Sequence, residues 1–329
     1  MVLVTGAAGF VGAHLVTALS AAGKEVRALY RNTEPDEKLR ALPGVEWMRC
    51  DLLDVFDVED AVAGVQTIFH CAATVSFAGS NGNELLHNNR ESTAHVVNAA
   101  LDAGTPRLVH LSSVATLGRS VLDAPLTEES LWEDGNANSK YAGSKWAAEL
   151  EVWRGAGEGL SVAILNPGII LGEPLLPAGW QTGSAALMKV AAGGFPFYTQ
   201  GINGWVDVVD VVRALMLLEK EPEATERFVF VEENHSYEDM LSGMAKALGT
   251  KVPHIGAGSF LSGLVWRWNA VRKLFGAKPT VTRETARTAQ QKVFYNTDKW
   301  QAAFPKFVFT PLAQTLARMA AAYRQDSKG

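Results

Sequence analysis

Residues 1–12 read MVLVTGAAGFVG, and this stretch decides the fold. It opens with an apolar run typical of a buried strand, and the sequence up to Gly23 then carries apolar residues at helical spacing. A glycine-rich turn between a strand and a helix directs backbone N–H groups and the positive end of the helix dipole to one point, which suits a pyrophosphate. We expect Gly6 to form the tight turn, Gly9 to let the backbone approach the phosphates, and Gly12 to bring the helix close to the strand. A glycine turn without a ligand is the alternative.

Composition narrows the class of protein. The 329 residues are enough for a nucleotide-binding domain with a smaller companion. A formal net charge of -5, with no block of like charges, argues against a nucleic-acid-binding surface. The two cysteines, Cys50 and Cys71, provide no disulfide framework, and the histidines lack ligand spacing with a carboxylate, so we expect no metal. Because no apolar stretch is long enough to span a bilayer and the first strand leaves no room for a signal peptide, we expect a cytoplasmic protein with a small-molecule substrate.

Five further apolar stretches read as strands, and helical stretches separate them. They are residues 24–30, 45–50, 65–73, 107–113 and 160–165. Such alternation predicts an α/β fold, a Rossmann doubly wound parallel sheet that is covered on both faces. Ligands of these sheets bind at the carboxyl ends of the strands. The residues expected there are the glycine turn, Arg31, Asp51, Ala72, Ser113 and Pro167.

The end of the second strand bears on the choice of cofactor. A carboxylate at this place binds the ribose 2′-hydroxyl, whereas an arginine accepts a 2′-phosphate. Tyr30 and Arg31 occupy the strand end and Glu34 comes later, so NADP is favoured over NAD, with a solvated surface arginine as the alternative. Asp51, just past the third strand, is expected to accept a hydrogen bond from the adenine amino group, to cap the helix that begins near Asp54, or both.

Residues 138–150 read NSKYAGSKWAAEL, a helical stretch in which Tyr141 and Lys145 lie on one face. A tyrosine has an unperturbed pKa near ~10, and we expect the Lys145 ammonium and an oxidised nicotinamide to favour its phenolate. Ser113 would then hydrogen-bond the substrate oxygen and position it for proton transfer with Tyr141. An amphipathic helix in which the tyrosine and lysine are merely neighbours is the alternative.

Four motifs follow one another along the chain: TGAAGFVG from Thr5, SSVATLG from Ser112, YAGSK from Tyr141 and NPGIILG from Asn166. Together they resemble the extended short-chain dehydrogenase/reductase family, which includes the NAD-dependent epimerase/dehydratases, and the resemblance covers nearly the whole chain. It implies a catalytic triad of Ser113, Tyr141 and Lys145, in which Tyr141 is the proton donor or acceptor. It also implies that Lys145 holds the nicotinamide ribose and that residues 167–170 line the nicotinamide.

The family pattern selects Ser113 over Ser112, because Ser113 stands five residues before Gly118, as the family's serine does before its glycine. The turn, the strand ends and the resemblance together imply one set of cofactor-binding residues. They are Gly6, Gly9, Phe10, Val11, Gly12, Arg31, Asp51, Leu52, Ala72, Ala73, Tyr141, Lys145, Pro167, Gly168, Ile169 and Ile170.

Two departures from the family pattern bear on the substrate. Members that act on nucleotide sugars usually carry an arginine just before a later block, which GWVDVVD from Gly204 resembles, and Asn203 stands at that position here. The sixth strand ends in Asn166-Pro167-Gly168, closer to the dihydroflavonol, cinnamoyl-CoA and 3β-hydroxysteroid members. Both departures imply a less charged carbonyl or alcohol substrate.

We expect residues 1–169 and 205–232 to form the Rossmann domain, and residues 170–204 and 233–329 to form a smaller, mostly helical substrate-binding lid. Residues 258–275 have an apolar and a basic face; packing on the lid or a partner subunit is favoured over a membrane surface, and a homodimer is one option left open. The leading interpretation is an NADP(H)-dependent oxidoreductase that moves hydride between nicotinamide and the carbonyl or alcohol of a small organic substrate. The alternatives are a nucleotide-sugar epimerase/dehydratase with retained NAD(P), and a non-catalytic dinucleotide-sensing protein.

Overall fold

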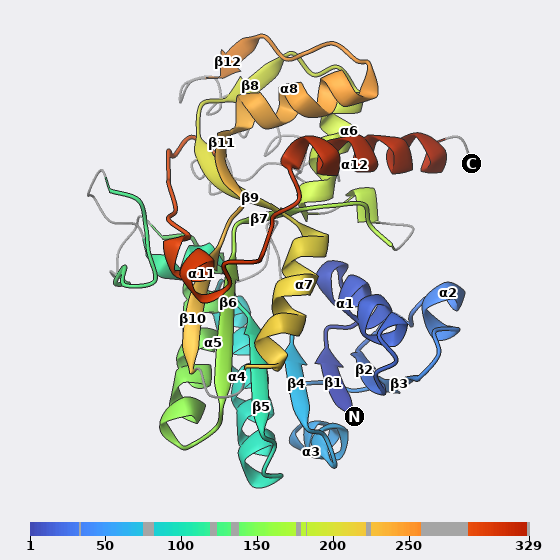
Figure 1. The fold of residues 1–329 in the computed structure, drawn as a ribbon, viewed down its shortest axis with the longest axis vertical. Helices are drawn as coiled ribbons and strands as arrows, with labels where there is room; N and C mark the ends of the chain where they lie inside the picture. Colours follow the sequence, from blue (N-terminus) through green and yellow to red (C-terminus); the bar gives the residue numbers. More distant parts are fainter. Residues whose placement is uncertain are drawn as a thin grey trace.

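A computed structural model gives the fold (Figure 1). It describes residues 1–32, 34–74, 82–118, 124–132, 138–175, 179–181, 183–221, 225–257 and 289–327. The amphipathic stretch at residues 258–275 lies outside these ranges. Within them, each helix is too short or too polar to cross a membrane.

A seven-stranded parallel sheet lies at the centre, in the order β10-β6-β5-β4-β1-β2-β3. Its strands are β1 (Val2–Thr5), β2 (Val26–Tyr30), β3 (Val45–Arg49), β4 (Thr67–His70), β5 (Arg107–Leu111), β6 (Val162–Pro167) and β10 (Glu226–Phe230). Strands β1, β4, β5 and β6 are buried along their whole length, because helices cover both faces of the sheet. The predicted Rossmann class is therefore confirmed, and a seventh strand, β10, lies at the edge of the sheet beside β6.

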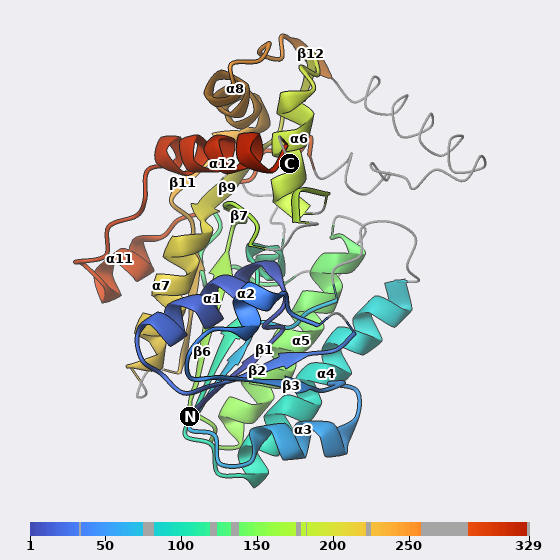
Figure 2. The same cartoon turned by 90° about the vertical axis from the view of Figure 1, so that its right-hand side faces the viewer.

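Two groups of helices sandwich the sheet (Figure 2). One face carries α1 (Phe10–Ala21) and α7 (Val208–Glu219), and the other carries α3 (Val55–Val62), α4 (Gly82–Asp102) and α5 (Lys140–Gly157). Smaller helical pieces are α2 (Glu37–Arg40), the 3-10 turn η1 (Val114–Leu117) and α11 (Asp298–Ala303). Helix α7 begins at Val208, because Val206 and Asp207 belong to a strand and the Asp207 carboxylate caps the helix.

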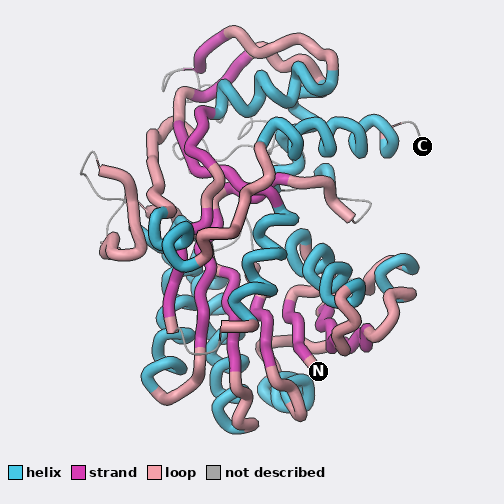
Figure 3. The backbone as a smooth tube through the Cα atoms, in the orientation of Figure 1, coloured by secondary structure: helices cyan, strands magenta, loops and turns pink. Residues whose placement is uncertain are grey.

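A second group of elements lies beyond the carboxyl ends of the parallel strands (Figures 1 and 3). Its strands are β7 (Ile169–Leu171), β8 (Phe197–Thr199), β9 (Ile202–Asp207), β11 (Glu233–Ser236) and β12 (Ile255–Ala257), and its main helices are α6 (Ala186–Ala192), α8 (Tyr237–Leu248) and α12 (Leu312–Asp326). Strands β11, β9 and β7 form one small sheet, and β12 and β8 form another. The group has an apolar core of its own, with Met188, Trp205, Met244 and Met319 fully buried.

Candidate active site

The glycine turn after β1 brings three parts of the backbone into close contact. Gly6 has a φ of 65°, in the left-handed region that favours glycine, and a Cβ added to it would lie 2.8 Å from the Cα of Ala72. A Cβ on Gly12 would lie 2.1 Å from the carbonyl oxygen of Gly6. Both glycines therefore have the backbone roles that the sequence predicts: Gly6 makes the turn, and Gly12 lets α1 approach it.

The first turn of α1 offers free backbone donors to a ligand. Gly9 caps the helix without a side-chain acceptor. In the described ranges, the N–H groups of Phe10, Val11 and Gly12 find no hydrogen-bond acceptor in the protein. Unpaired N–H groups at the positive end of a helix bind phosphates, so this turn fits the pyrophosphate of a dinucleotide.

A second predicted group lies at the end of β2. Arg31 is exposed there, and its carbonyl oxygen accepts a hydrogen bond of 3.4 Å from Nε of Arg49. Among the described residues Arg31 has no carboxylate partner, so its guanidinium remains available to an anion. Glu34, by contrast, forms an ion pair with Arg40.

The cap predicted for Asp51 is wrong. Asp54 is the N-cap of α3, and its Oδ1 accepts from the backbone N–H groups of Phe56 at 3.0 Å and Asp57 at 3.3 Å. Asp51 lies too early in the chain to reach that turn, and its Oδ1 accepts from the N–H of Leu53 instead. The contact of Asp51 with an adenine amino group stays a prediction.

The other predicted cofactor residues also follow central strands. The backbone N–H of Ala72 donates to Oγ1 of Thr5 at 3.1 Å, which ties the end of β4 to the end of β1. The remaining positions are Leu52 after β3, Ala73 after β4, Pro167 at the end of β6, Gly168, and Ile169 and Ile170 in β7. Since β6, β5, β4, β1, β2 and β3 are adjacent and parallel, these residues share one edge of the sheet with the glycine turn.

The three predicted catalytic side chains come together at this edge. Ser113 begins η1, and its Oγ accepts a hydrogen bond of 3.2 Å from the N–H of Ala115. Tyr141, at the start of α5, forms a side-chain hydrogen bond with Ser113. Lys145, one turn later, is only 3% exposed, and its Nζ donates to the carbonyl oxygen of Leu111 at 2.9 Å.

Burial sets the charge states of these groups. It raises the pKa of Tyr141, and the hydrogen bond with Ser113 offsets only part of that rise. It lowers the pKa of Lys145 to about 8, whereas Glu149 and Cys71 raise it. Burial therefore outweighs the hydrogen bond and leaves the pKa of Tyr141 raised. The expected effect of Lys145 and an oxidised nicotinamide on the phenolate stays a prediction. Tyr141 is a phenol at neutral pH and can donate a proton to a substrate oxygen.

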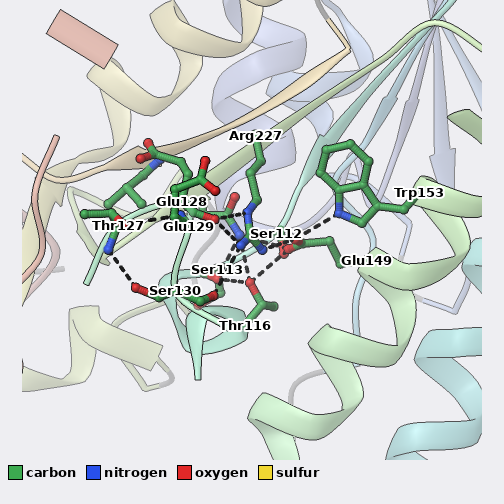
Figure 4. Close-up of polar contacts among 12 residues, drawn as sticks. Ser112, Ser113, Thr116, Thr127, Glu128, Glu129, Ser130, Glu149, Trp153 and Arg227 are labelled. Carbon is green, nitrogen blue, oxygen red and sulfur yellow. Dashed lines mark hydrogen bonds and ion pairs between the residues drawn. The ribbon is translucent and has the colours of Figure 1, made fainter. Parts of the chain in front are cut away.

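A buried carboxylate near the Ser113 turn was missed by the sequence analysis (Figure 4). Glu149 lies on α5 one turn beyond Lys145 and is 0% exposed. Its contacts are with Ser112, Thr116, Asn166, Trp153 and Arg227. The signal was present in the sequence, since Tyr141, Lys145 and Glu149 follow one another at four-residue spacing and so share a helix face.

A buried asparagine was missed as well. Asn89 of α4 accepts from the backbone N–H of Thr74 at 2.7 Å and donates to its carbonyl oxygen at 3.1 Å. Its Nδ2 also donates to Oγ of Ser144 on α5 at 3.0 Å. Asn89 therefore fastens the segment after β4 to the helix that carries Tyr141 and Lys145. A single asparagine in a helix gives no sequence signal for such a role.

Comparison with known proteins adds independent findings. The model of the NAD dependent epimerase/dehydratase family matches residues 2–231. Cinnamoyl-CoA reductase 1 of Petunia hybrida is 31% identical over 245 residues, which cover 70% of this chain and 72% of that protein. The putative dihydroflavonol 4-reductase of Synechocystis sp. is 29% identical over 304 residues, or 90% of this chain and 87% of that protein. The solved structure of MoeE5 in complex with UDP-glucose and NAD is similar over 99% of both chains, with a TM-score of 0.75 and 25% identity. These matches confirm the resemblance drawn from the four sequence motifs.

Proposed function

The chain belongs to the NAD dependent epimerase/dehydratase family of extended short-chain dehydrogenases/reductases, and from this we propose that it is an NADP(H)-dependent reductase of a small carbonyl compound. Membership makes it an NAD(P)-dependent enzyme. A bound nicotinamide supplies or accepts hydride, and the protein supplies the proton and the alignment. The observation that carries the proposal is the Tyr141 phenol, which Ser113 holds in place and burial keeps protonated.

Each residue of the triad has a separate task in this proposal. The phenol of Tyr141 donates its proton to the carbonyl oxygen of the substrate as hydride reaches the carbon, so the product is an alcohol. Ser113 hydrogen-bonds the same oxygen and holds it in line. Lys145, fixed by the Leu111 carbonyl, stabilises the phenolate left on Tyr141 and holds the nicotinamide ribose.

The glycine turn and the start of α1 support the assignment of a dinucleotide. The close contact of Gly12 with Gly6 and the unpaired N–H groups of the first turn of α1 favour a pyrophosphate. The guanidinium of Arg31, which has no carboxylate partner among the described residues, favours a 2′-phosphate, and hence NADP over NAD. Asp51 and Leu52 would border the adenine, and residues 167–170 the nicotinamide.

Two observations favour a reductase acting on a weakly charged substrate. The relatives at 31% and 29% identity carry the names of reductases. Asn203, at the position where sugar-nucleotide members usually carry an arginine, is a neutral residue in β9 whose Oδ1 accepts from the N–H of Gly204 at 2.9 Å. An amide lacks the charge that grips a substrate diphosphate.

A nucleotide-sugar epimerase/dehydratase is the second candidate. The observation that favours it is the similarity, over nearly the full chain, to MoeE5 in complex with UDP-glucose and NAD. Such an enzyme would oxidise and reduce one substrate with a retained cofactor, using the same Tyr141. The non-catalytic sensor is less favoured, because a sensor has no need of a proton donor.

We also propose that residues 170–204 and 233–329 form the substrate-binding lid, and residues 1–169 and 205–232 the cofactor-binding domain. The separate apolar core around Met188 and Met244 supports this division, as does the place of that core beyond the strand ends (Figure 1). Trp205 belongs to that core, whereas Trp300 and Phe307 pack in the core of the central sheet, so the packing departs from the division at these three residues.

The test is a panel of substrates assayed with both cofactors. Purified protein is dialysed, its bound nucleotide is measured, and it is then supplied with NADPH or NADH and with cinnamoyl-CoA, a dihydroflavonol, simple aldehydes and ketones, or UDP-glucose. A reductase consumes NADPH in proportion to the alcohol formed. An epimerase retains its nucleotide through dialysis and converts the nucleotide sugar without net NADPH consumption. A sensor binds the dinucleotide and converts none of these compounds.

A further inference from the structure

Glu149 is an ionisable residue in an interior that normally excludes single charges. Its side chain has 0% exposure, and five side chains surround its two oxygens. On Oε2 it accepts from Oγ of Ser112 at 2.5 Å, Oγ1 of Thr116 at 2.9 Å and Nδ2 of Asn166 at 2.9 Å; on Oε1 it accepts from Nη1 of Arg227 at 3.1 Å and Nε1 of Trp153 at 3.4 Å. Figure 4 shows this network converging on the carboxylate. Both oxygens of the buried carboxylate therefore have hydrogen-bond partners, and Arg227 supplies an opposite charge.

Three of the residues that contact Glu149 also border the turn that carries Ser113. Ser112 precedes it, Thr116 lies in the turn that it begins, and both hydroxyls end on Oε2 of Glu149. Asn166 of β6 donates to the same Oε2 and, at 3.1 Å, to the carbonyl oxygen of Ser113. The hydroxyl of Thr116 likewise lies 2.9 Å from that carbonyl. One carboxylate therefore ties the turn that carries Ser113 to the helix that carries Tyr141.

Glu149 also faces Lys145 across one helical turn, a spacing at which side chains interact. The other titratable groups facing this ammonium come from the ends of β4 and β5. Burial lowers the pKa of His70 to about 3, lowers that of His110 well below its usual value and raises that of Cys71 to about 12, so all three are uncharged at neutral pH. Glu149 thus raises the pKa of Lys145 and so counteracts the effect of burial, which lowers it. Arg227 of β10 forms an ion pair with Glu149 and partly neutralises its charge.

We propose that Glu149 is a positioning residue for the catalytic step, one that holds the Ser113 turn in place and sets a carboxylate one helical turn from the Lys145 ammonium. The inference rests on the proposed function, because it requires that Ser113 and Lys145 act in the reaction. It assigns two effects to one side chain: the length of the side chain sets the geometry, and its charge acts on Lys145.

The charge is tested by following the ionisation of Lys145 directly. Protein labelled with carbon-13 at lysine Cε is titrated by NMR, and the Lys145 signal is identified by its loss in Lys145→Met. Glu149→Gln should lower the titration midpoint by about one pH unit, because the ammonium loses an opposite charge. Arg227→Gln should raise the midpoint, since it leaves Glu149 unneutralised. Circular dichroism and NADPH binding verify that each variant folds.

The geometry is tested by turnover of cinnamoyl-CoA with NADPH, or of whichever carbonyl compound the panel shows to be reduced. Glu149→Asp keeps the charge, so the midpoint should return close to the wild-type value, but its shorter side chain should leave turnover about tenfold down or more. The alkaline limb of the pH profile should follow the NMR midpoint in each variant. If Glu149→Gln does not fold, the other two variants still test both roles. Arg227→Gln tests the charge role through a raised Lys145 midpoint, and Glu149→Asp tests the geometric role through lower turnover at an unchanged midpoint.

Unchanged midpoints in the folded Glu149→Gln and Arg227→Gln proteins would overturn the charge role, and wild-type turnover in Glu149→Asp would overturn the geometric role. Neither result touches the proposed function. That function fails by a different result, namely undiminished turnover in Tyr141→Phe and Lys145→Met.

Discussion

Ser113 and Tyr141 lie on different elements, the turn after β5 and the start of α5, and their side chains form a hydrogen bond. The bond favours ionisation of Tyr141, but burial outweighs it and raises the pKa of the phenol. The proton-bearing form of Tyr141 is therefore both oriented and stable at neutral pH. A phenol in that state suits the reduction of a carbonyl, in which the protein must supply a proton.

Replacement of Tyr141 by phenylalanine keeps the ring and removes only the proton. We expect turnover to fall by orders of magnitude while NADPH binds as before, because the lost interaction belongs to the chemical step. Steady-state kinetics and a NADPH titration measure the two effects. Tyr323→Phe, in the remote core of α12, is the matched control. Near-normal turnover in Tyr141→Phe would refute the catalytic role.

Replacement of Lys145 by methionine should impair two functions at once. The ammonium is expected to hold the nicotinamide ribose and to stabilise the phenolate, so both NADPH affinity and turnover should drop. Lys246→Met, on the exposed surface of α8, serves as the control. A Lys145→Met protein that loses rate but keeps its cofactor affinity would contradict the double role.

The pKa of about 8 for Lys145 gives a prediction for the pH profile. Burial lowers that pKa, so the ammonium is complete below it and is lost as the pH rises through it. Turnover should therefore decline on the alkaline side as Lys145 loses its proton. A profile that stays flat until the range of an unperturbed lysine, near ~10.4, would contradict the shift.

The cofactor preference depends on Arg31. A charge-assisted contact with a 2′-phosphate contributes about 1.5–3 kcal/mol, which corresponds to roughly a tenfold to hundredfold preference for NADPH. Arg31→Ala should weaken NADPH binding by such a factor and leave NADH binding nearly unchanged, whereas Arg324→Ala on α12 should change neither. Titration of both nucleotides measures this. Equal affinities in the wild type would end the NADP proposal, and Glu34, now paired with Arg40, would become the ribose ligand to test.

Gly12 has no room for a methyl group beside the turn. A Cβ there would lie 2.1 Å from the carbonyl oxygen of Gly6, so Gly12→Ala must push α1 away from the turn. We expect a lower melting temperature and loss of NADPH binding. Gly157→Ala is the matched control, because a Cβ at Gly157 has open space and alanine favours the helix by about 1 kcal/mol. A Gly12→Ala protein that is as stable as the wild type and binds NADPH would contradict this account, because it would show that the glycine turn can accommodate the methyl group.

The central sheet could be predicted from the sequence because its strands are short apolar runs, separated by stretches with apolar residues at helical spacing. Residues 1–5 and 160–165 show this pattern, and the structure places β1 and β6 there. The second group of elements was predicted only as mostly helical. Strands such as β7 and β8 have three residues each, too few to establish a period of two, and they depend on partners distant in the chain.

The candidate site was predictable where a residue follows a strand or shares a helix face. Arg31 and Lys145 were predicted in this way. The direction of the Tyr141 pKa was not, since burial by the finished fold decides it. Glu149 was missed although it shares that helix face, because four of its five partners lie on segments that meet α5 only in three dimensions; the fifth, Trp153, lies on α5 itself. The cap of α3 was assigned to Asp51 instead of Asp54, because the sequence does not fix the start of a helix to a single residue.

The most direct test of the central claim follows a labelled hydride. Purified protein is incubated with NADPH that carries deuterium at the transferable position of C4, together with the carbonyl compounds of the panel, and the products are examined by mass spectrometry. The account predicts an alcohol with deuterium on the former carbonyl carbon, formed in step with NADP⁺ by the wild type and almost not at all by Tyr141→Phe. It would be contradicted if no carbonyl compound gained deuterium while UDP-glucose was converted by protein that still held its own nucleotide.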